Sequence, residues 1–289
     1  MIRLSGIVAN LPEHEYHASP ELSSSGVRLM LPEYRGSLRK FQWAQSRPRT
    51  SRAFDLGHAV HAKVLGVGLG IVTYPDDHLT PAGNPSTRAA TVEWESAQRS
   101  AGFTIVSPSD LARADAMTEA VLAHPTACLY LEVAQQREVS VFAEVDGVPC
   151  RARFDALSGE TRNGVYAVDL KTAEDATVSG FTHSVKKWGY DVQEAHYGDV
   201  YEAATGAGID DFHFVVVEKA APYEVAVFQL TEQWVDMGRA KAAAARRLFA
   251  EATASGVWPG YDTAPTFLAP PAWAVIEHEL DYEYGEIKV

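Results

Sequence analysis

Three segments between residues 138 and 173 alternate apolar and polar side chains with a period of two, and no other feature constrains the fold as strongly. They read EVSVFAEV, VPCRARFDAL and VYAVDLKTA. The first two are separated by Asp146-Gly147, and a longer turn over residues 158–164 leads to the third. Alternation of this length is typical of β-strands, and an Asp-Gly pair favours a tight hairpin turn. We therefore expect three strands joined by turns.

The rest of the chain combines helical periodicity with two more apolar strands. Helices are expected at about residues 51–65, 88–101, 109–123, 176–187, 190–204 and 231–254, and strands at 212–218 and 223–230. A turn-rich stretch over 74–90 and a proline-rich tail from 258 are expected to be irregular. We predict a single α/β domain over residues 1–289, in which helices flank a central mixed β-sheet. It has an N-terminal helical part over about 1–135, a core over about 136–230, and a C-terminal helix and tail over about 231–289.

Composition excludes several classes of protein. A chain of 289 residues, 46% of them hydrophobic, can bury a sizeable core. Its longest apolar runs fall far short of the roughly 20 residues of a membrane span, and its N-terminus reaches Pro12 too early for a secretory signal. Cys128 and Cys150 supply neither a disulfide framework nor a four-cysteine metal site. We expect a cytoplasmic protein with no membrane partner.

The net charge of −13 argues against a nucleic-acid partner, because phosphate binding depends on Lys and Arg. The charge is unevenly distributed, however. Between residues 28 and 52 the chain carries seven basic residues and one acid, Glu33, whereas the thirteen residues from Glu277 hold five acids and one lysine. This asymmetry allows a local basic surface, although such a run is also typical of a solvated face.

An acid and a base end the third strand. Asp169 and Lys171 share a face of it, and Asp155 ends the preceding strand. If these strands pair, the two carboxylates come close and repel by roughly 4 kcal/mol at an effective dielectric constant of 20, unless a proton or cation intervenes. Oxygen ligands without thiolates favour Mg²⁺ or Mn²⁺. The alternative is a cross-strand salt bridge on a solvated face, which contributes little.

The order of these residues resembles the PD-(D/E)xK nuclease core. Asp155 stands at its first acidic position, Asp169 at its second and Lys171 at its lysine, while Phe154 replaces the proline. GHAVH resembles the G-x-x-x-H pattern of RecB-like members, which implies that His61 is a metal ligand. QEAHY resembles their Q-x-x-x-Y pattern, at Gln193 and Tyr197.

More narrowly, four segments resemble RecE-type exonucleases, the exodeoxyribonuclease VIII family of phage and prophage recombination: EYHASPELSSSGVRLML, AFDLGHAVHAKVL, REVSVFAEVDGVPCRARFDAL and VDLKTAEDATVSGF. The resemblance implies a Mg²⁺-dependent exonuclease, with Mn²⁺ as substitute, that degrades the 5′-ended strand of duplex DNA. Its partners would be DNA ends, a single-strand annealing protein and further copies of itself in a ring, which would let a basic channel coexist with an acidic exterior. A phage-encoded member would act in the cytoplasm of a bacterial host.

The resemblance also implies roles for individual residues. The metal ligands would be His61, Asp155, Asp169 and the main-chain carbonyl of Leu170. Lys171 would position the attacking water and stabilise the phosphate, while Gln193 and Tyr197 would support the geometry of the site. The candidates for DNA contact are Ser25, Arg28, Arg47, Arg49, Arg52, Arg151 and Arg153, with Lys186 and Lys187 next.

Several alternatives stay open. His58 lies on the same helix face as His61, Glu138 and Glu144 could reach the site or line a solvated edge, and Ser23 to Ser25 could hold a 5′-phosphate or simply cap a helix. The chain could instead be a Cas4-like or RecB-like single-strand nuclease without an iron-sulfur cluster. It could also be an inactive DNA-end-binding accessory protein, although the intact acids and lysine argue against loss of activity.

Overall fold

The computed structural model describes residues 5–283 except 46, 48–51, 163 and 263. The chain divides into a large unit, Met1–Trp258, and a small one, Pro259–Val289. The single domain predicted over residues 1–289 spans both units. Within the described residues, no helix combines the length and the apolar character needed to cross a membrane.

The large unit is built on a mixed six-stranded sheet in the order β1-β4-β5-β6-β7-β8. Only the pair β6 and β7 is parallel; the other neighbours are antiparallel. A separate parallel pair, β2 and β3, was not expected from the sequence. The strands are β1 (Gly6–Val8), β2 (Gly70–Thr73), β3 (Phe103–Val106), β4 (Gln136–Val145), β5 (Val148–Leu157), β6 (Tyr166–Ala173), β7 (Asp211–Glu218) and β8 (Val225–Phe228).

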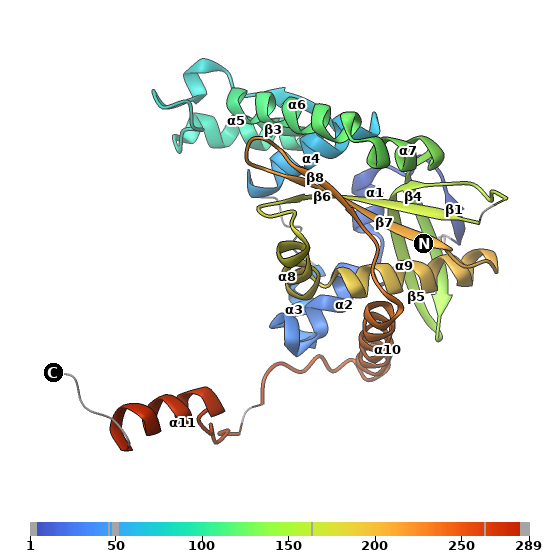
Figure 1. The fold of residues 1–289 in the computed structure, drawn as a ribbon, viewed down its shortest axis with the longest axis vertical. Coiled ribbons are helices and arrows are strands. Elements are labelled where there is room, and N and C mark those ends of the chain that lie inside the picture. Colours follow the sequence, from blue (N-terminus) through green and yellow to red (C-terminus); the bar gives the residue numbers. More distant parts are fainter. Residues whose placement is uncertain (1–4, 46, 48–51, 163, 263, 284–289) are drawn as a thin grey trace. The chain divides into compact units, whose positions relative to one another are not determined.

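Helices cover both faces of the sheet, as Figure 1 shows. One group comprises α4 (Arg52–Leu65), α5 (Ala89–Ser100), α6 (Pro108–Ala123) and α7 (Pro125–Val133). The opposite group comprises α2 (Ser24–Met30), α3 (Leu38–Gln45), α8 (Val178–Trp188), α9 (Tyr190–Thr205) and α10 (Glu232–Ser255). Shorter helical segments are α1 (Glu13–Ala18) and 3₁₀ turns at Pro32–Tyr34 and Asp76–His78. The predicted mixed sheet flanked by helices is thus confirmed.

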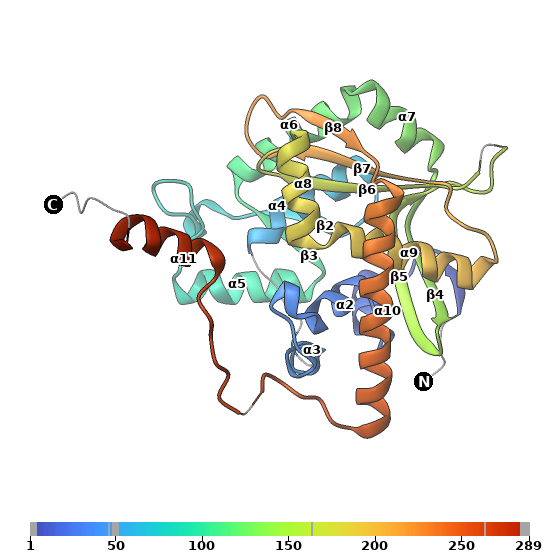
Figure 2. The same ribbon diagram turned by 60° about the horizontal axis from the view of Figure 1, so that its bottom comes forward.

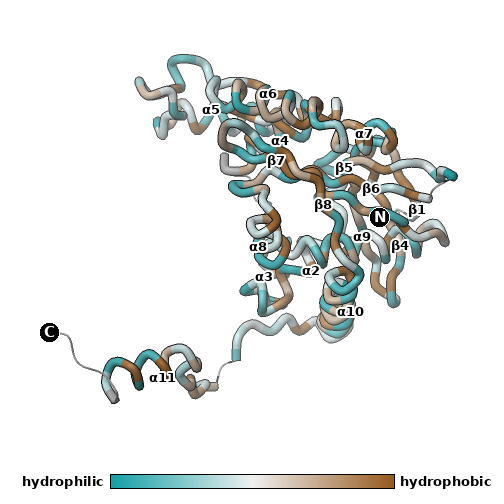
Figure 3. Tube along the Cα trace, in the orientation of Figure 1, coloured by the Kyte–Doolittle hydropathy of each residue, from teal (hydrophilic) through white to brown (hydrophobic). Residues whose placement is uncertain are grey.

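The strand pattern folds as the alternation predicts. Asp146 and Gly147 both have positive φ, 51° and 75°, which is the conformation of a type I′ hairpin turn between β4 and β5. Successive residues of β6 belong to opposite cores: Ala167 packs with the α2 and α8–α10 group, whereas Val168 packs with α4, α6 and α7. Figure 3 shows hydrophobic residues concentrated along these strands. Side chains at alternate positions of β6 therefore reach different helices.

The small unit corrects one expectation. The tail from residue 258 was expected to be irregular, but it contains α11 (Ala272–His278), continued by a π-helical segment over Glu279–Glu283. Prolines precede this helix rather than interrupt it, since Pro271 stands at its N-cap. The prolines at residues 259–271 therefore lie before the helix and are compatible with it.

Helix α10 crosses α9 at a glycine (Figure 2). A Cβ atom at Gly238 would overlap the backbone carbonyl of Asp191, so the two helices approach as closely as their backbones allow. Beyond the crossing, buried Arg246 donates to Asp199 at 3.0 Å and to Asp146 at 2.9 Å. These contacts fix α9, the helix that carries Gln193, against the hairpin of β4 and β5.

We predict that Gly238→Ala destabilises the protein, because the new methyl group meets backbone atoms that cannot rotate away. Overpacking of this kind costs about 1–3 kcal/mol. The matched control is Gly198→Ala in α9, where a Cβ meets nothing within 4 Å and helix propensity should stabilise by about 0.5–1 kcal/mol. Urea unfolding of both variants measures the difference, and equal midpoints would contradict the close packing of α9 and α10.

Candidate active site

The two predicted aspartates lie where β5 and β6 separate. The strands pair through Ala156 with Val168 and Leu157 with Ala167, and Asp155 and Asp169 come next on each strand. In the gap that opens, Asp155 Oδ2 accepts the backbone N–H of Leu170 at 2.8 Å. The side chains of both aspartates are largely buried. The acids expected at neighbouring strand ends therefore do lie together.

His61 approaches this gap from α4. The helix buries an apolar stripe that includes Leu56, Val60 and Val64, which turns His61 toward β5. Its Nδ1 lies 3.4 Å from Asp155 Oδ2. Burial is the main cause that lowers the pKa of His61, which favours the neutral imidazole. Neutral imidazole is the form that binds metal ions.

His58, the alternative histidine, does not lie beside the two aspartates. It stacks on Phe54 with ring centroids 6.4 Å apart. Burial lowers its pKa, with Glu13 as the strongest opposing charge. Of the two histidines on α4, His61 is the one beside the aspartates.

Glu138 joins the site, which the sequence left open. The register of β4 and β5 pairs Arg137 with Ala156 and Val139 with Phe154, which places Glu138 at the level of Asp155, and its φ of 51° sets it apart from extended strand backbone. One ligand atom each from His61, Glu138 and Asp155 lies within 4.8 Å of the others. The signal available from sequence was the period-two alternation, which places Glu138 opposite Asp155 once the hairpin register is known. Glu144, further along β4, is exposed and outside this cluster.

Asp169, Lys171 and Gln193 form a closed polar ring on the other side of the gap. Lys171 Nζ pairs with Asp169 Oδ2 and donates to Gln193 Oε1 at 3.0 Å. Gln193 Nε2 in turn donates to Asp169 Oδ1 at 2.5 Å. The ring of Tyr190 lies 4.7 Å from Lys171 Nζ. Gln193 therefore holds the acid and the lysine in one arrangement.

Burial and the neighbouring acids have opposite effects on the pKa of Lys171. They have the same effect on the pKa of Asp155. Burial lowers the pKa of Lys171, but Asp169, Tyr190 and Asp155 outweigh it, so the pKa is raised and the ammonium persists. For Asp155, burial, Asp169 and Glu138 all raise the pKa, well above its ordinary value. Lys171 pairs with Asp169 and Arg153 pairs with Glu138, so within the cluster of His61, Glu138 and Asp155 the Asp155 carboxyl lies beside the His61 imidazole rather than beside a lysine or arginine. The carboxylate and imidazole donors of this cluster suit a divalent cation such as Mg²⁺ or Mn²⁺.

Tyr197 lies behind the site rather than in it. It is buried edge-on against Phe154, with ring centroids 4.9 Å apart. This arrangement anchors α9 to β5 one turn after Gln193. The residue that replaces the family's proline, Phe154, is thus the surface on which α9 rests.

The candidates for DNA contact are scattered. Arg151 is only 8% exposed and donates to the carbonyl of Ser19, so its position gives no support to DNA contact. Arg153 pairs with Glu138 at 2.5 Å, which places it beside the cluster of His61, Glu138 and Asp155. Arg28 donates to the carbonyl of Trp188.

The other candidates for DNA contact lie near the N-terminus. Arg47 lies 4.8 Å from the ring of Trp43. Ser25 is exposed, whereas Ser23 accepts the N–H of Gly26 and caps α2. Arg49 and the side chain of Arg52 lie outside the described part of the chain.

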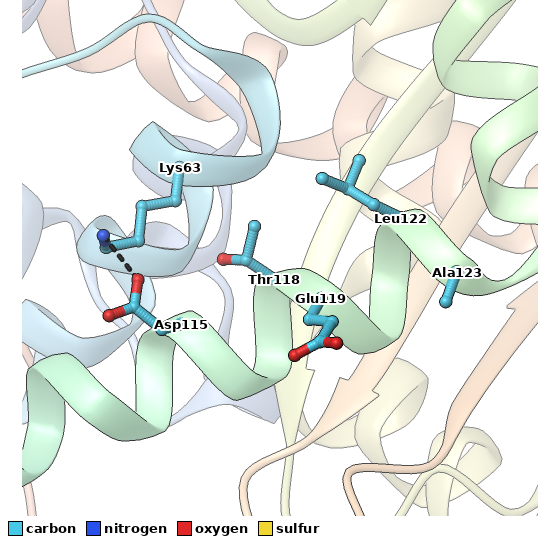
Figure 4. A pocket seen from close by; sticks show the side chains of 6 residues that line it. All are labelled: Lys63, Asp115, Thr118, Glu119, Leu122 and Ala123. Carbon is cyan, nitrogen blue, oxygen red and sulfur yellow. Dashed lines mark ion pairs between the residues drawn. The ribbon is translucent and has the colours of Figure 1, made fainter.

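A surface hollow on α4 and α6 is separate from these residues (Figure 4). It is lined by Lys63, Asp115, Thr118, Glu119, Leu122 and Ala123. Lys63 and Asp115 pair across it at 2.6 Å. It contains none of the predicted site residues.

The fold places Asp155, Asp169 and Lys171 together at the gap between β5 and β6, as in a nuclease-like core of the PD-(D/E)xK class. Residues 38–264 match the model of a family described as a PDDEXK-like domain of unknown function (DUF3799), and the chain belongs to this family. The predicted membership of the PD-(D/E)xK superfamily is therefore confirmed. A search of curated proteins finds no match.

One of three similar solved structures shares the fold. A Eubacterium rectale protein provisionally assigned as an exonuclease superposes with a TM-score of 0.58 at 14% identity, covering 94% of this chain and 97% of its own. The protein SSO0001 gives a TM-score of 0.27 at 15% identity, covering 71% and 85%. An alkaline exonuclease from Laribacter hongkongensis gives 0.22 at 15% identity, covering 70% and 91%. Only the first similarity is large enough to indicate a shared fold.

We predict that Asp155→Asn stabilises the metal-free protein above about pH 4. Because folding raises the pKa of this carboxyl, the folded state binds its proton more tightly than the unfolded state, and stability falls as pH rises from the unfolded pKa toward the folded one. Because asparagine has no ionisable side chain, Asp155→Asn does not lose stability over this pH range. Urea midpoints in EDTA should be higher for Asp155→Asn at pH 8 and converge near pH 4.

The control for this experiment is Asp236→Asn, an exposed carboxylate paired only with Arg239 in the same helix. Its midpoint should follow the parent at every pH, because exposed ion pairs contribute little. Identical midpoints for Asp155→Asn and the parent at pH 8 would show that the ionised Asp155 carboxylate does not lower the stability of the folded protein.

Proposed function

We propose that this protein is a Mg²⁺-dependent DNA exonuclease that degrades the 5′-ended strand of linear duplex DNA. The 3′ single strand that remains would serve phage-type homologous recombination. The observation that carries the proposal is the pairing of two clusters in one gap: His61, Glu138 and Asp155 on one side, and Asp169 with Lys171 on the other. Such a pair offers both a cation site and a fixed ammonium beside it.

The metal would be held by His61, Asp155, Glu138 and the carbonyl of Leu170. When bound, Mg²⁺ polarises a phosphoryl oxygen and lowers the pKa of bound water. Asp169 was also expected to be a ligand. It is 3% exposed, close enough to raise the pKa of Asp155, and oriented by Gln193, so it can complete the site from the side of β6.

Lys171 would act on the reacting phosphate. Its raised pKa keeps it charged, and its bond to Gln193 fixes the ammonium in the gap. A positioned cation stabilises the negative charge that develops on phosphate oxygens and orients the attacking water. Gln193 is a positioning residue in this scheme, since it contacts Lys171 and Asp169 rather than the substrate.

Two further parts of the proposal concern partners. Ends of double-stranded DNA are the substrate, and an annealing protein would take up the product. Assembly into a ring would reconcile the net charge of −13 with DNA binding, because a basic lining could face inward. A single-strand nuclease and an inactive end-binding protein are the alternatives, and end-labelled substrates separate all three.

We predict that Lys171→Gln abolishes cleavage, because the amide removes the charge but retains polar contacts with Asp169 and Gln193. The parent with Mg²⁺ should release label from the 5′ end of linear duplex before label from the 3′ end. The control is Lys219→Gln, a lysine paired with exposed Glu174. Circular dichroism confirms folding of each variant. Cleavage by Lys171→Gln at the parental rate would exclude this active site, and release from the 3′ end first would exclude the polarity.

We also predict that His61→Ala weakens Mn²⁺ binding, because the imidazole is one of three donors within 4.8 Å. His58→Ala, on the same helix, is the matched control and should bind like the parent. Titration calorimetry with Mn²⁺ measures both without any need for catalysis. If the two variants lost affinity equally, the histidine would not be a ligand.

A further inference from the structure

An exposed tryptophan ends α8 next to two lysines. The Trp188 side chain is 48% exposed, and Lys186 and Lys187 occupy the same last turn, both exposed. Lys187 Nζ lies 4.7 Å from the indole ring. Phe181 and Val185 are buried on the inner face of the helix, and Trp188, one turn after Val185, lies exposed at the end of that face beside the two lysines. Aromatic and basic side chains combined in this way are typical of surfaces that bind single-stranded nucleic acid.

The backbone holds Trp188 in place. Gly189 follows it with a φ of 66°, and a Cβ there would lie 2.7 Å from Arg28 Cδ and 3.0 Å from Tyr34. Arg28 donates a hydrogen bond to the Trp188 carbonyl. The turn between α8 and α9 is thus packed against α2 and the following 3₁₀ turn. An aromatic side chain on such a turn is positioned before any ligand arrives.

The same turn leads directly into the proposed active site. Tyr190, two residues after Trp188, has its ring 4.7 Å from Lys171 Nζ. Two residues span at most about 7 Å of chain. A strand whose phosphate contacts Lys171 would therefore pass Trp188 within a few nucleotides.

We infer that this turn binds a single DNA strand, with a nucleobase stacked on Trp188 and phosphates contacted by Lys186 and Lys187. The inference rests on the proposed nuclease function and specifies the form of the substrate beside the site. Bases of an intact duplex are already stacked on one another, so the indole recognises a strand that has separated. The ligand that fits this turn is the DNA strand that enters the active site as substrate or leaves it as product.

The lysines and the exposed tryptophan, each taken alone, are also typical of a solvated helix end. Lysines in a last turn stabilise the helix dipole, and single exposed apolar residues are common. The chain offers a direct comparison in Trp43 on α3, which is 55% exposed and lies 4.8 Å from Arg47. It has the same chemistry but lies on α3, whereas Trp188 lies two residues before Tyr190, whose ring lies 4.7 Å from Lys171 Nζ.

The test compares Trp188→Ala, Trp188→Phe and Trp43→Ala in the full-length chain. Fluorescence anisotropy measures the affinity of a short oligo-dT strand in Ca²⁺, which replaces Mg²⁺ to limit cleavage. Loss of one stacked base, worth about 1–3 kcal/mol, corresponds to about 5- to 150-fold weaker binding for Trp188→Ala. Trp188→Phe should retain most of the affinity, and Trp43→Ala should bind like the parent.

A salt series on Lys186→Gln/Lys187→Gln adds a second measurement. The slope of log affinity against log salt should fall by up to about 1.4, since each phosphate contact on a single strand contributes about 0.7. Parental affinity of Trp188→Ala, or an equal loss in Trp43→Ala, would overturn the inference while the parent still cleaves DNA. A parent that neither binds nor cleaves DNA would overturn the proposed function as well.

Discussion

The structure depends on one unfavourable arrangement, the close approach of buried carboxylates at the point where β5 and β6 separate. Asp155 and Asp169 each end a paired stretch of strand, and Glu138 reaches the same gap from β4. Two such charges about 4 Å apart repel by roughly 4 kcal/mol at an effective dielectric constant of 20. Lys171 compensates Asp169 and Arg153 compensates Glu138, which leaves the charge of Asp155 to a proton or a bound cation.

The surrounding scaffold explains how a marginally stable fold keeps this arrangement. Helices reach the gap from both faces of the sheet, α4 with His61 and α9 with Gln193. Gly238 lets α10 approach α9 closely, because a Cβ at this position would overlap the backbone carbonyl of Asp191. Because α4 and α9 are both held by apolar packing, the polar groups need not supply the stability that positions them.

Local sequence patterns predicted the parts of the site that local structure determines. Alternation predicted the three strands, and the spacing of Asp155, Asp169 and Lys171 predicted their meeting once the strands paired. Glu138 could not be assigned, because its place depends on hairpin register and an unusual φ. Arg151 could not be recognised as buried, because its partner Ser19 lies 132 residues away in sequence. The helix in the tail was missed because prolines at residues 259–271 obscured the apolar periodicity after them.

The central claim is that the acids in the gap form a divalent cation site, and anomalous diffraction tests it most directly. Crystals of the full-length chain grown with Mn²⁺ would be measured at the manganese absorption edge. If the gap binds a divalent cation, an anomalous peak is expected in coordinating contact with the imidazole of His61 and the carboxylates of Glu138 and Asp155. A map with no peak in this gap, at Mn²⁺ concentrations that saturate binding in solution, would contradict it.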